Sequence, residues 1–348
     1  MGAFARLALG TRRLAIRARR IRAAARRQHC AREARLNSRP VEVVAAVIER
    51  PDGSFLLAQR PRGKVYAGYW EFPGGKVEPG EALPAALARE LHEELGIDVQ
   101  TAHPWMVQDY TYPHATVRLN FFRVRAWQGE PHGREEQQLA WQRVGRLSVA
   151  PLLPANAPVL RALELPVEYA ITHASEIGVE RQLECLERRL AQGLRLIQVR
   201  EKSMPAPELA RFAAKVIALA RPHGARVLIN SDLDLAERLG ADGVHLPAAR
   251  LAQLEQRPAR GWCAASCHNA DELACAERLG LDFVVLGPVQ ATLSHPDALT
   301  LGWDGFAALA RGASLPVFAL GGMKPGELET AWRCGAQGIA MVRASWQF

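Results

Sequence analysis

Eight short apolar runs recur through the second half of the chain, and they constrain its fold more than any other feature. Helical segments such as residues 208–220 and 271–279 separate them. Strands that alternate with helices form parallel β/α units, and eight such units close into a TIM barrel. We therefore predict a (β/α)8 TIM barrel over residues 167–348. The predicted strands are Glu168–Thr172, Leu196–Val199, Val227–Asn230, Gly243–Leu246, Trp262–Ser266, Phe283–Leu286, Val317–Leu320 and Gly338–Val342.

The first half, residues 41–165, predicts a smaller α/β domain. Val41–Glu49 is apolar and rich in β-branched residues, and a Pro-Asp-Gly turn connects it to a second strand, Phe55–Arg60. We predict a helix over Leu83–Leu95, because leucine recurs at every fourth position and forms one buried stripe. Gly96 follows as the residue that ends the helix.

Three acidic residues of this helix, Glu90, Glu93 and Glu94, share one face away from the leucines. Like charges at this spacing repel one another, so a compensating cation is expected, and clustered carboxylates suit Mg²⁺ or Mn²⁺. Arg89 can pair with one of them, and the preceding Gly74-Gly75 loop lets backbone approach a phosphate. The pattern indicates metal-assisted attack on a phosphoanhydride. The alternative is a solvated acidic helix face.

The spacing of these residues resembles the Nudix box at every defined position. The matching residues are Gly75, Glu81, Arg89-Glu90-Leu91, Glu93-Glu94 and Gly96-Ile97. The resemblance implies an α/β/α Nudix sandwich that binds its metal on the three helical glutamates. It also implies hydrolysis of a nucleoside diphosphate linked to another group, with Arg89 orienting a box glutamate and Glu81 bracing the loop.

The segment Trp70–Lys76, WEFPGGK, resembles the MutT branch, which hydrolyses 8-oxo-dGTP to 8-oxo-dGMP and pyrophosphate. The resemblance implies that Glu135 and the backbone carbonyl near Gly74 assist the metal site. Asn156, considered without the surrounding segment, has an alternative role as the N-cap of a helix at residues 157–165. The sequence departs from the branch at Ala115, where an arginine is expected. The implied substrate contacts are Arg60, Phe72, Lys76 and Asn156, of which Asn156 would read the oxidised purine.

The second half resembles thiamine-phosphate synthase and its relative TenI over nearly its whole length, through QVREK, INSDLDLA, GADGVHL, SCHN, LGPV and ALGGM. It departs where the synthase places magnesium carboxylates, because this chain has Ser231 and Arg250, and the loop at residues 291–295 lacks the family's lysine. We therefore expect binding of a phosphorylated thiazole or pyrimidine ligand without synthase activity. A barrel kept for packing or for contacts in a homodimer is the alternative. The expected ligand residues are Gln198, Arg200, Lys202, Asn230, Ser266, His268, Gly321 and Gly322.

Charge is distributed unevenly along the chain. Residues 1–40 contain twelve arginines and one acid, whereas the rest carries a small net negative charge. The net charge of the residues after position 40 therefore does not indicate nucleic-acid binding. We expect the arm to be a disordered tail; a basic amphipathic helix that binds phosphate or anionic lipid is the alternative. The scattered cysteines and the lack of a long apolar run predict a cytoplasmic protein without a membrane span.

The sequence thus predicts a Mg²⁺- or Mn²⁺-dependent hydrolase that removes 8-oxo-dGTP from the nucleotide pool. Two other hypotheses concern the attached barrel. In one, both halves serve thiamine metabolism, with the first half clearing faulty diphosphates. In the other, the barrel is a ligand-binding module that regulates the hydrolase.

Overall fold

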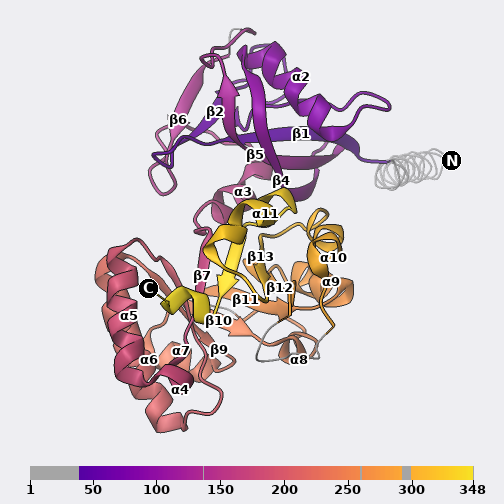
Figure 1. The fold of residues 1–348 in the computed structure, drawn as a ribbon. Helices are drawn as coiled ribbons and strands as arrows, with labels where there is room; N and C mark the ends of the chain where they lie inside the picture. Colours follow the sequence, from indigo (N-terminus) through magenta and orange to yellow (C-terminus); the bar gives the residue numbers. More distant parts are fainter. Residues whose placement is uncertain (1–38, 136, 259–260, 292–298, 348) are drawn as a thin grey trace, which may run out of the picture.

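The computed structural model describes residues 39–347, except 136, 259–260 and 292–298. The expectations for the basic arm, and for most of the loop at residues 291–295, therefore lie outside the described residues. The described chain forms an α/β sandwich followed by a closed β/α barrel (Figure 1).

Two three-stranded sheets build the first half. One has the order β1-β5-β4, in which β1 and β5 are parallel and β4 and β5 are antiparallel. The other has the order β3-β2-β6, with antiparallel neighbours. The strands are β1 (Val41–Ile48), β2 (Phe55–Gln59), β3 (Trp70–Glu71), β4 (Asp98–Thr111), β5 (Thr116–Gln128) and β6 (Leu139–Gln142).

One helix covers each side of this half. α2 (Leu83–Leu95) buries Leu87, Leu91 and Leu95 completely against β1, β2 and β5, as the leucine stripe predicts. α3 (Ala157–Ala162) follows a 3₁₀ turn, η1 (Pro154–Asn156), and packs into a second core with Phe55, Phe72 and Phe121. The result is the predicted α/β/α arrangement, although α3 is shorter than the helix expected over residues 157–165.

The second half is an eight-stranded, all-parallel closed barrel, which confirms the fold predicted from the alternating pattern. Every predicted strand is present, with bounds within one residue of those predicted. Its strands are β7 (Glu168–Ile171), β8 (Leu196–Val199), β9 (Arg226–Asn230), β10 (Gly243–Leu246), β11 (Trp262–Cys267), β12 (Phe283–Leu286), β13 (Val317–Leu320) and β14 (Gly338–Met341). Its helices are α4 (Ala174–Ile177), α5 (Val179–Ala191), α6 (Ala206–Ala220), α7 (Leu233–Leu239), α8 (Ala248–Leu251), α9 (Ala270–Arg278), α10 (Gly302–Ala310) and α11 (Leu328–Arg333).

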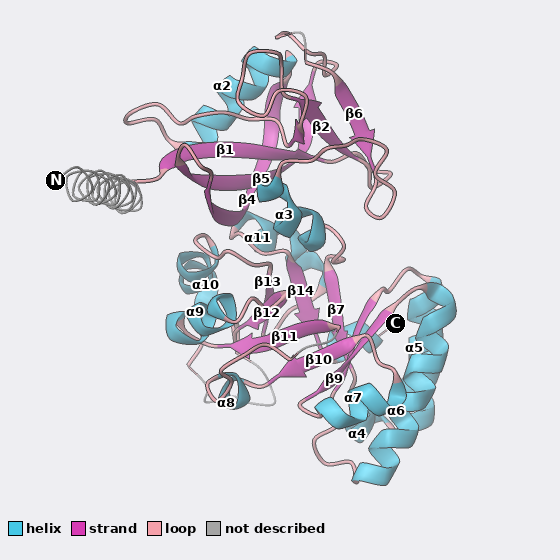
Figure 2. Ribbon diagram, turned by 180° about the vertical axis from the view of Figure 1, so that it is seen from behind, coloured by secondary structure: helices cyan, strands magenta, loops and turns pink. Residues whose placement is uncertain are grey.

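The first half docks on the end of the barrel at which its strands begin. Val107 of β4 donates a backbone hydrogen bond to Ala313, just before β13, and Arg161 of α3 reaches Asp282, just before β12. Figures 1 and 2 show α3 and α11 between the two halves and α2 on the far side of the sandwich. The loops at the carboxyl ends of the strands, where TIM barrels carry their sites, are therefore not covered by the sandwich.

A buried glutamine is central to this interface. Gln337, at 0% exposure, accepts hydrogen bonds from Trp105 Nε1 (2.9 Å) and Arg123 Nη1 (3.4 Å) of the sandwich. Its own amide donates to the Leu165 carbonyl in the connecting segment (2.8 Å). Because buried polar groups are costly to leave unpaired, this side chain favours one specific docking of the two halves. Among the described residues, no helix is long and apolar enough to span a membrane.

Candidate active sites

Arg89 organises the acidic face of α2. Its Nη1 lies 2.9 Å from Glu90 and 3.3 Å from Glu93, so one guanidinium holds two of the three predicted metal ligands. Its Nε and Nη2 each lie 2.9 Å from Glu81, and Nη2 also donates to the Lys76 carbonyl. The fork geometry of arginine therefore ties the loop before the helix to the acidic face.

Glu81 braces the loop, as the resemblance implies. Its carboxylate accepts a hydrogen bond from the Glu78 backbone N–H (3.0 Å) as well as those from Arg89. The Arg89 hydrogen bonds, followed by the one from Glu78, lower the pKa of Glu81 to about 2. Glu81 therefore stays ionised and holds the loop to Arg89 and to the Glu78 backbone.

The two glycines before α2 are required by close contacts. Gly74 has φ +145°, and a Cβ there would overlap the Val44 carbonyl. A Cβ on Gly75 would overlap the Glu90 carboxyl group. Within the described residues, the carbonyls of Pro73 and Gly75 accept hydrogen bonds from β1, whereas no such bond involves the Gly74 carbonyl. The Gly74 carbonyl oxygen therefore keeps both lone pairs within the described part of the chain.

A lysine lies among the remaining carboxylates. Lys64 Nζ is 2.6 Å from Glu135, and its charge also acts on Glu94 of α2. Burial, together with the negative charges of Glu90, Glu135 and Glu71, raises the pKa of Glu94 to about 7 despite that lysine. This is an acidic site that lacks sufficient positive charge, and its oxygen ligands fit a Mg²⁺ or Mn²⁺ ion. Among the described residues, no three acidic, histidine or cysteine side chains are gathered closely enough to form a metal cluster as they stand.

Two of the predicted nucleotide contacts, Arg60 and Phe72, directly follow β2 and β3. Arg60 Nη1 lies 2.6 and 2.7 Å from the two carboxylate oxygens of Glu71, and burial raises the pKa of Glu71. Phe72 is 4% exposed, and its ring centroid lies 5.8 Å from those of both Phe55 and Phe121. Lys76 is exposed at the start of the loop.

Asn156 ends η1 and is 4% exposed. Asn156 occupies the N-cap position of α3, as the alternative predicts, but its side chain forms no capping hydrogen bond. Instead, Asn156 Nδ2 donates to the Trp70 carbonyl on β3 (3.3 Å). This bond holds the amide beside the strand that leads into Phe72, and it leaves the side-chain oxygen and a second N–H for another partner.

The barrel mouth contains a buried neutral hydrogen-bond network. His245 Nε2 lies 2.9 Å from Ser266 Oγ, and His245 Nδ1 lies 3.3 Å from Tyr169 OH, which also accepts from Gln198 (3.1 Å). Burial, with a smaller contribution from the charge of Arg200, lowers the pKa of His245 to about 3. The ring is therefore neutral and a poor base.

Two cations lie at the same mouth. Among the described residues, no ion pair is formed by Arg200 or Lys202, and the charge of Arg200 lowers the pKa of Lys202. The neighbouring Glu201 is occupied, because its carboxylate accepts from the backbone N–H groups of Ala174 and Ser175. Within the described part of the mouth, two cations that form no ion pair favour an anionic ligand over a metal.

The other barrel residues predicted to bind a ligand have different surroundings. Asn230 donates to its neighbour Ser231, and His268 is exposed and contacts Glu272. Gly321 and Gly322 both have positive φ and lie against residues 288–291. The structure thus places Gln198 and Ser266 in one network, whereas His268 points to a local partner on α9.

Comparison with known families assigns both halves. A family described as thiamine monophosphate synthase matches residues 168–345, and a NUDIX domain family matches residues 44–162. The chain belongs to both families. It is a MutT-like Nudix domain followed by a thiamine-phosphate synthase/TenI-like barrel.

Individual relatives each match one half. A putative thiamine-phosphate synthase 2 of Aquifex aeolicus (strain VF5) is 37% identical over 182 residues, 52% of this chain and 97% of the relative. A CTP pyrophosphohydrolase of Escherichia coli (strain K12) is 43% identical over 122 residues, 35% of this chain and 90% of the relative. An 8-oxo-dGTP diphosphatase of Haemophilus influenzae (strain ATCC 51907 / DSM 11121 / KW20 / Rd) is 37% identical over 128 residues, 37% of this chain and 94% of the relative.

Sequence reasoning missed two charged residues of the Nudix site. Lys64 lies in a loop that the sequence marks only by its glycines and aromatics, so nothing local indicates that it reaches Glu135 across the fold. Glu71 is part of the WEFPGGK segment and could have been selected there. Its pairing with Arg60 follows from the antiparallel register of β2 and β3.

Proposed function

We propose that the Nudix half hydrolyses an oxidised purine nucleoside triphosphate, 8-oxo-dGTP, to the monophosphate and pyrophosphate. The observation that carries the proposal is the single acidic face of α2, held by Arg89 beside the Gly74-Gly75 loop. The buried Asn156 amide, which η1 holds against the Trp70 carbonyl of β3, supports recognition of a purine edge. Similarity to an 8-oxo-dGTP diphosphatase agrees with this substrate class.

In this mechanism, Glu90, Glu93, Glu94 and Glu135 would hold Mg²⁺ or Mn²⁺, with the free Gly74 carbonyl as a further ligand. The ion would neutralise phosphate charge and polarise the attacking water. A carboxylate of α2 accepts a proton from that water as its oxygen attacks phosphorus. The bond to the leaving phosphate oxygen then breaks, which gives a monophosphate and pyrophosphate. Arg60, Phe72, Lys76 and Asn156 bind the nucleotide, with Lys76 on the phosphate side.

A product assay tests this proposal. The full chain with Mg²⁺ is offered 8-oxo-dGTP, dGTP, CTP and thiamine diphosphate, and pyrophosphate and phosphate are measured separately. We expect preference for 8-oxo-dGTP with release of pyrophosphate, loss of activity in Glu94→Gln, and full activity in the exposed control Glu78→Gln. Preference for CTP would overturn the assigned base. Preference for thiamine diphosphate with release of phosphate would overturn the nucleotide class and favour a shared thiamine pathway.

We propose a second function for the barrel, which is to bind a phosphorylated thiazole or pyrimidine ligand without synthase chemistry. The observation that favours it is the pair Arg200 and Lys202, which form no ion pair within the described residues and lie beside a neutral mouth, with Ser231 and Arg250 at the positions of the expected acids. Thermal unfolding with added pyrophosphate should show stabilisation that Arg200→Met removes. Formation of thiamine phosphate from pyrimidine diphosphate and thiazole phosphate would refute the loss of synthase activity.

A further inference from the structure

The segment that carries Asn156 is held at both ends. At its start, the Leu153 backbone N–H donates to the Trp70 carbonyl (3.0 Å), and Trp70 donates back to Pro151 (2.8 Å). Asn156 adds its side-chain bond to the same Trp70 carbonyl. α3 follows at once, so the contacts with Trp70 and the position of α3 together determine where the Asn156 amide lies.

The other end of the segment is held by the barrel. The Arg161 guanidinium lies 3.4 Å from the ring centroid of Trp262, and Arg161 Nε lies 3.3 Å from Asp282 Oδ1. Three residues later, Glu164 accepts two hydrogen bonds from Arg226, at 2.7 Å to its carbonyl and 2.8 Å to its carboxylate. These contacts join α3 to the starts of β9, β11 and β12.

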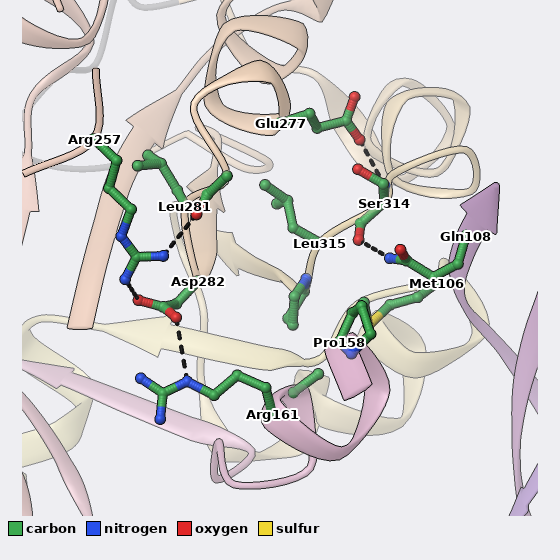
Figure 3. Close-up of a pocket in the computed structure, with 13 residues that line it drawn as sticks. Met106, Gln108, Pro158, Arg161, Arg257, Glu277, Leu281, Asp282, Ser314 and Leu315 are labelled. Carbon is green, nitrogen blue, oxygen red and sulfur yellow. Dashed lines mark hydrogen bonds and ion pairs between the residues drawn. The ribbon is translucent and has the colours of Figure 1, made fainter. Parts of the chain in front are cut away.

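The barrel fixes Asp282 independently of α3. Its side chain is 5% exposed, and it accepts from Arg257 (2.5 Å) and from the Cys263 backbone N–H (2.7 Å). Figure 3 shows Arg161 and Arg257 directed at different oxygens of this carboxylate. The Asp282 carboxylate therefore keeps its partners Arg257 and Cys263 when Arg161 is removed, and no buried acid is left unpaired.

A cleft separates the rest of α3 from the barrel on this side. Its volume is about 310 Å³; Pro158 and Ala162 of α3 line one side, and Leu281 and Leu315 of the barrel line another (Figure 3). Close packing does not join these two surfaces, so Arg161 is one of the side chains that link α3 to the barrel, beside the Arg226–Glu164 pair, while Val159 on the other side of α3 packs into the sandwich core. Removal of the Arg161 contacts therefore loosens the barrel side of α3, where the Arg226–Glu164 pair remains.

We propose that the barrel is a positioning element for base recognition, and that Arg161, clamped between Trp262 and Asp282, holds α3 so that Asn156 presents its amide to the base. This inference rests on the proposed function. Arg161 touches neither substrate nor metal, so it acts through the position of Asn156. The chemistry on α2, on the far side of the sandwich, is not altered by the clamp.

Enzyme kinetics of the full chain test this role. Arg161→Met should raise KM for 8-oxo-dGTP and reduce its selectivity over dGTP by about tenfold, with kcat nearly unchanged. Arg161→Lys should recover most of the selectivity, because it keeps a cation over the Trp262 ring. Gln108→Ala is the matched control, because Gln108 bonds the Ser314 carbonyl across the same interface from β4 and not from α3.

Hydrogen exchange provides a readout that does not depend on activity. Amides of residues 153–163 should exchange faster in Arg161→Met than in Gln108→Ala. Wild-type selectivity in Arg161→Met, or equal loss in the Gln108→Ala control, would overturn the inference. If the wild-type protein prefers another nucleotide, the proposed substrate fails, whereas the clamp is still tested by KM for that nucleotide and by the exchange of this segment.

Discussion

The neutral histidine of the barrel mouth gives a quantitative prediction. His245 is 2% exposed and faces Ser266 Oγ at 2.9 Å and Tyr169 OH at 3.3 Å. Substitution His245→Gln replaces the ring with an amide that also donates and accepts hydrogen bonds but does not titrate. The difference between the two proteins therefore isolates the proton on this ring.

The direction in which stability changes with pH follows from the lowered pKa of His245. The unfolded chain binds a proton on this histidine below its ordinary pKa of 6.5, whereas the folded chain resists it until about 3. Stability from the neutral ring is therefore complete above pH 6.5 and is lost as the pH falls from 6.5 toward 3. The loss is about 1.4 kcal/mol per pH unit, or about 2 kcal/mol at roughly pH 5. Glu94 has a raised pKa and contributes with the opposite sign, but it is present in both proteins and cancels.

Urea unfolding, followed by circular dichroism at about pH 7.5 and about pH 5, measures the free energy of unfolding of each protein. We expect the wild-type protein to lose about 2 kcal/mol more than His245→Gln between these conditions. Parallel losses in the two proteins would show that the ring is protonated or solvated in the fold. A protonated His245 would then add its positive charge to those of Arg200 and Lys202 at the barrel mouth.

Three substitutions test other parts of the structure. Gly75→Ala should lower kcat by about 100-fold without unfolding the chain, because the added methyl displaces the Glu90 carboxyl; unchanged kcat with wild-type circular dichroism would contradict this. Arg89→Met should weaken Mg²⁺ activation by roughly 10–100-fold, since the acidic face loses its common partner, and a Mg²⁺ titration of activity measures it. Gln337→Leu should lower the free energy of unfolding by about 2–3 kcal/mol, because Trp105 Nε1 loses its acceptor inside the interface; a urea midpoint equal to that of the wild-type protein would refute the role of this side chain.

Much of the fold could be predicted because the pattern that encodes it is local. The barrel strands are short apolar runs bounded by turns, and all eight were located from the sequence. The leucine stripe of α2 likewise needs only the helical period, and it is buried as predicted. α3 ended early because the chain turns there to enter the barrel, where Glu164 is held by Arg226.

The candidate site residues likewise divide into those that local spacing predicts and those that only long-range contacts bring into place. Glu90, Glu93 and Glu94 could be grouped from their spacing, because three and four residues along a helix return to one face. Lys64 could not be placed, since its partner Glu135 is 71 positions away. The side chain of Asn156 could not be assigned either, because its acceptor, Trp70, lies on a strand 86 positions earlier.

The sequence by itself determined the two families, the order of their elements and the acidic helix face, because each depends on residue types at short spacing. Only the tertiary structure decided how the two halves meet. The docking depends on Gln337, Trp105 and Arg123, and on Arg161 with Trp262, which are brought together by packing across more than 100 positions. No local period encodes such contacts, so the link between the barrel and Asn156 became visible only in three dimensions.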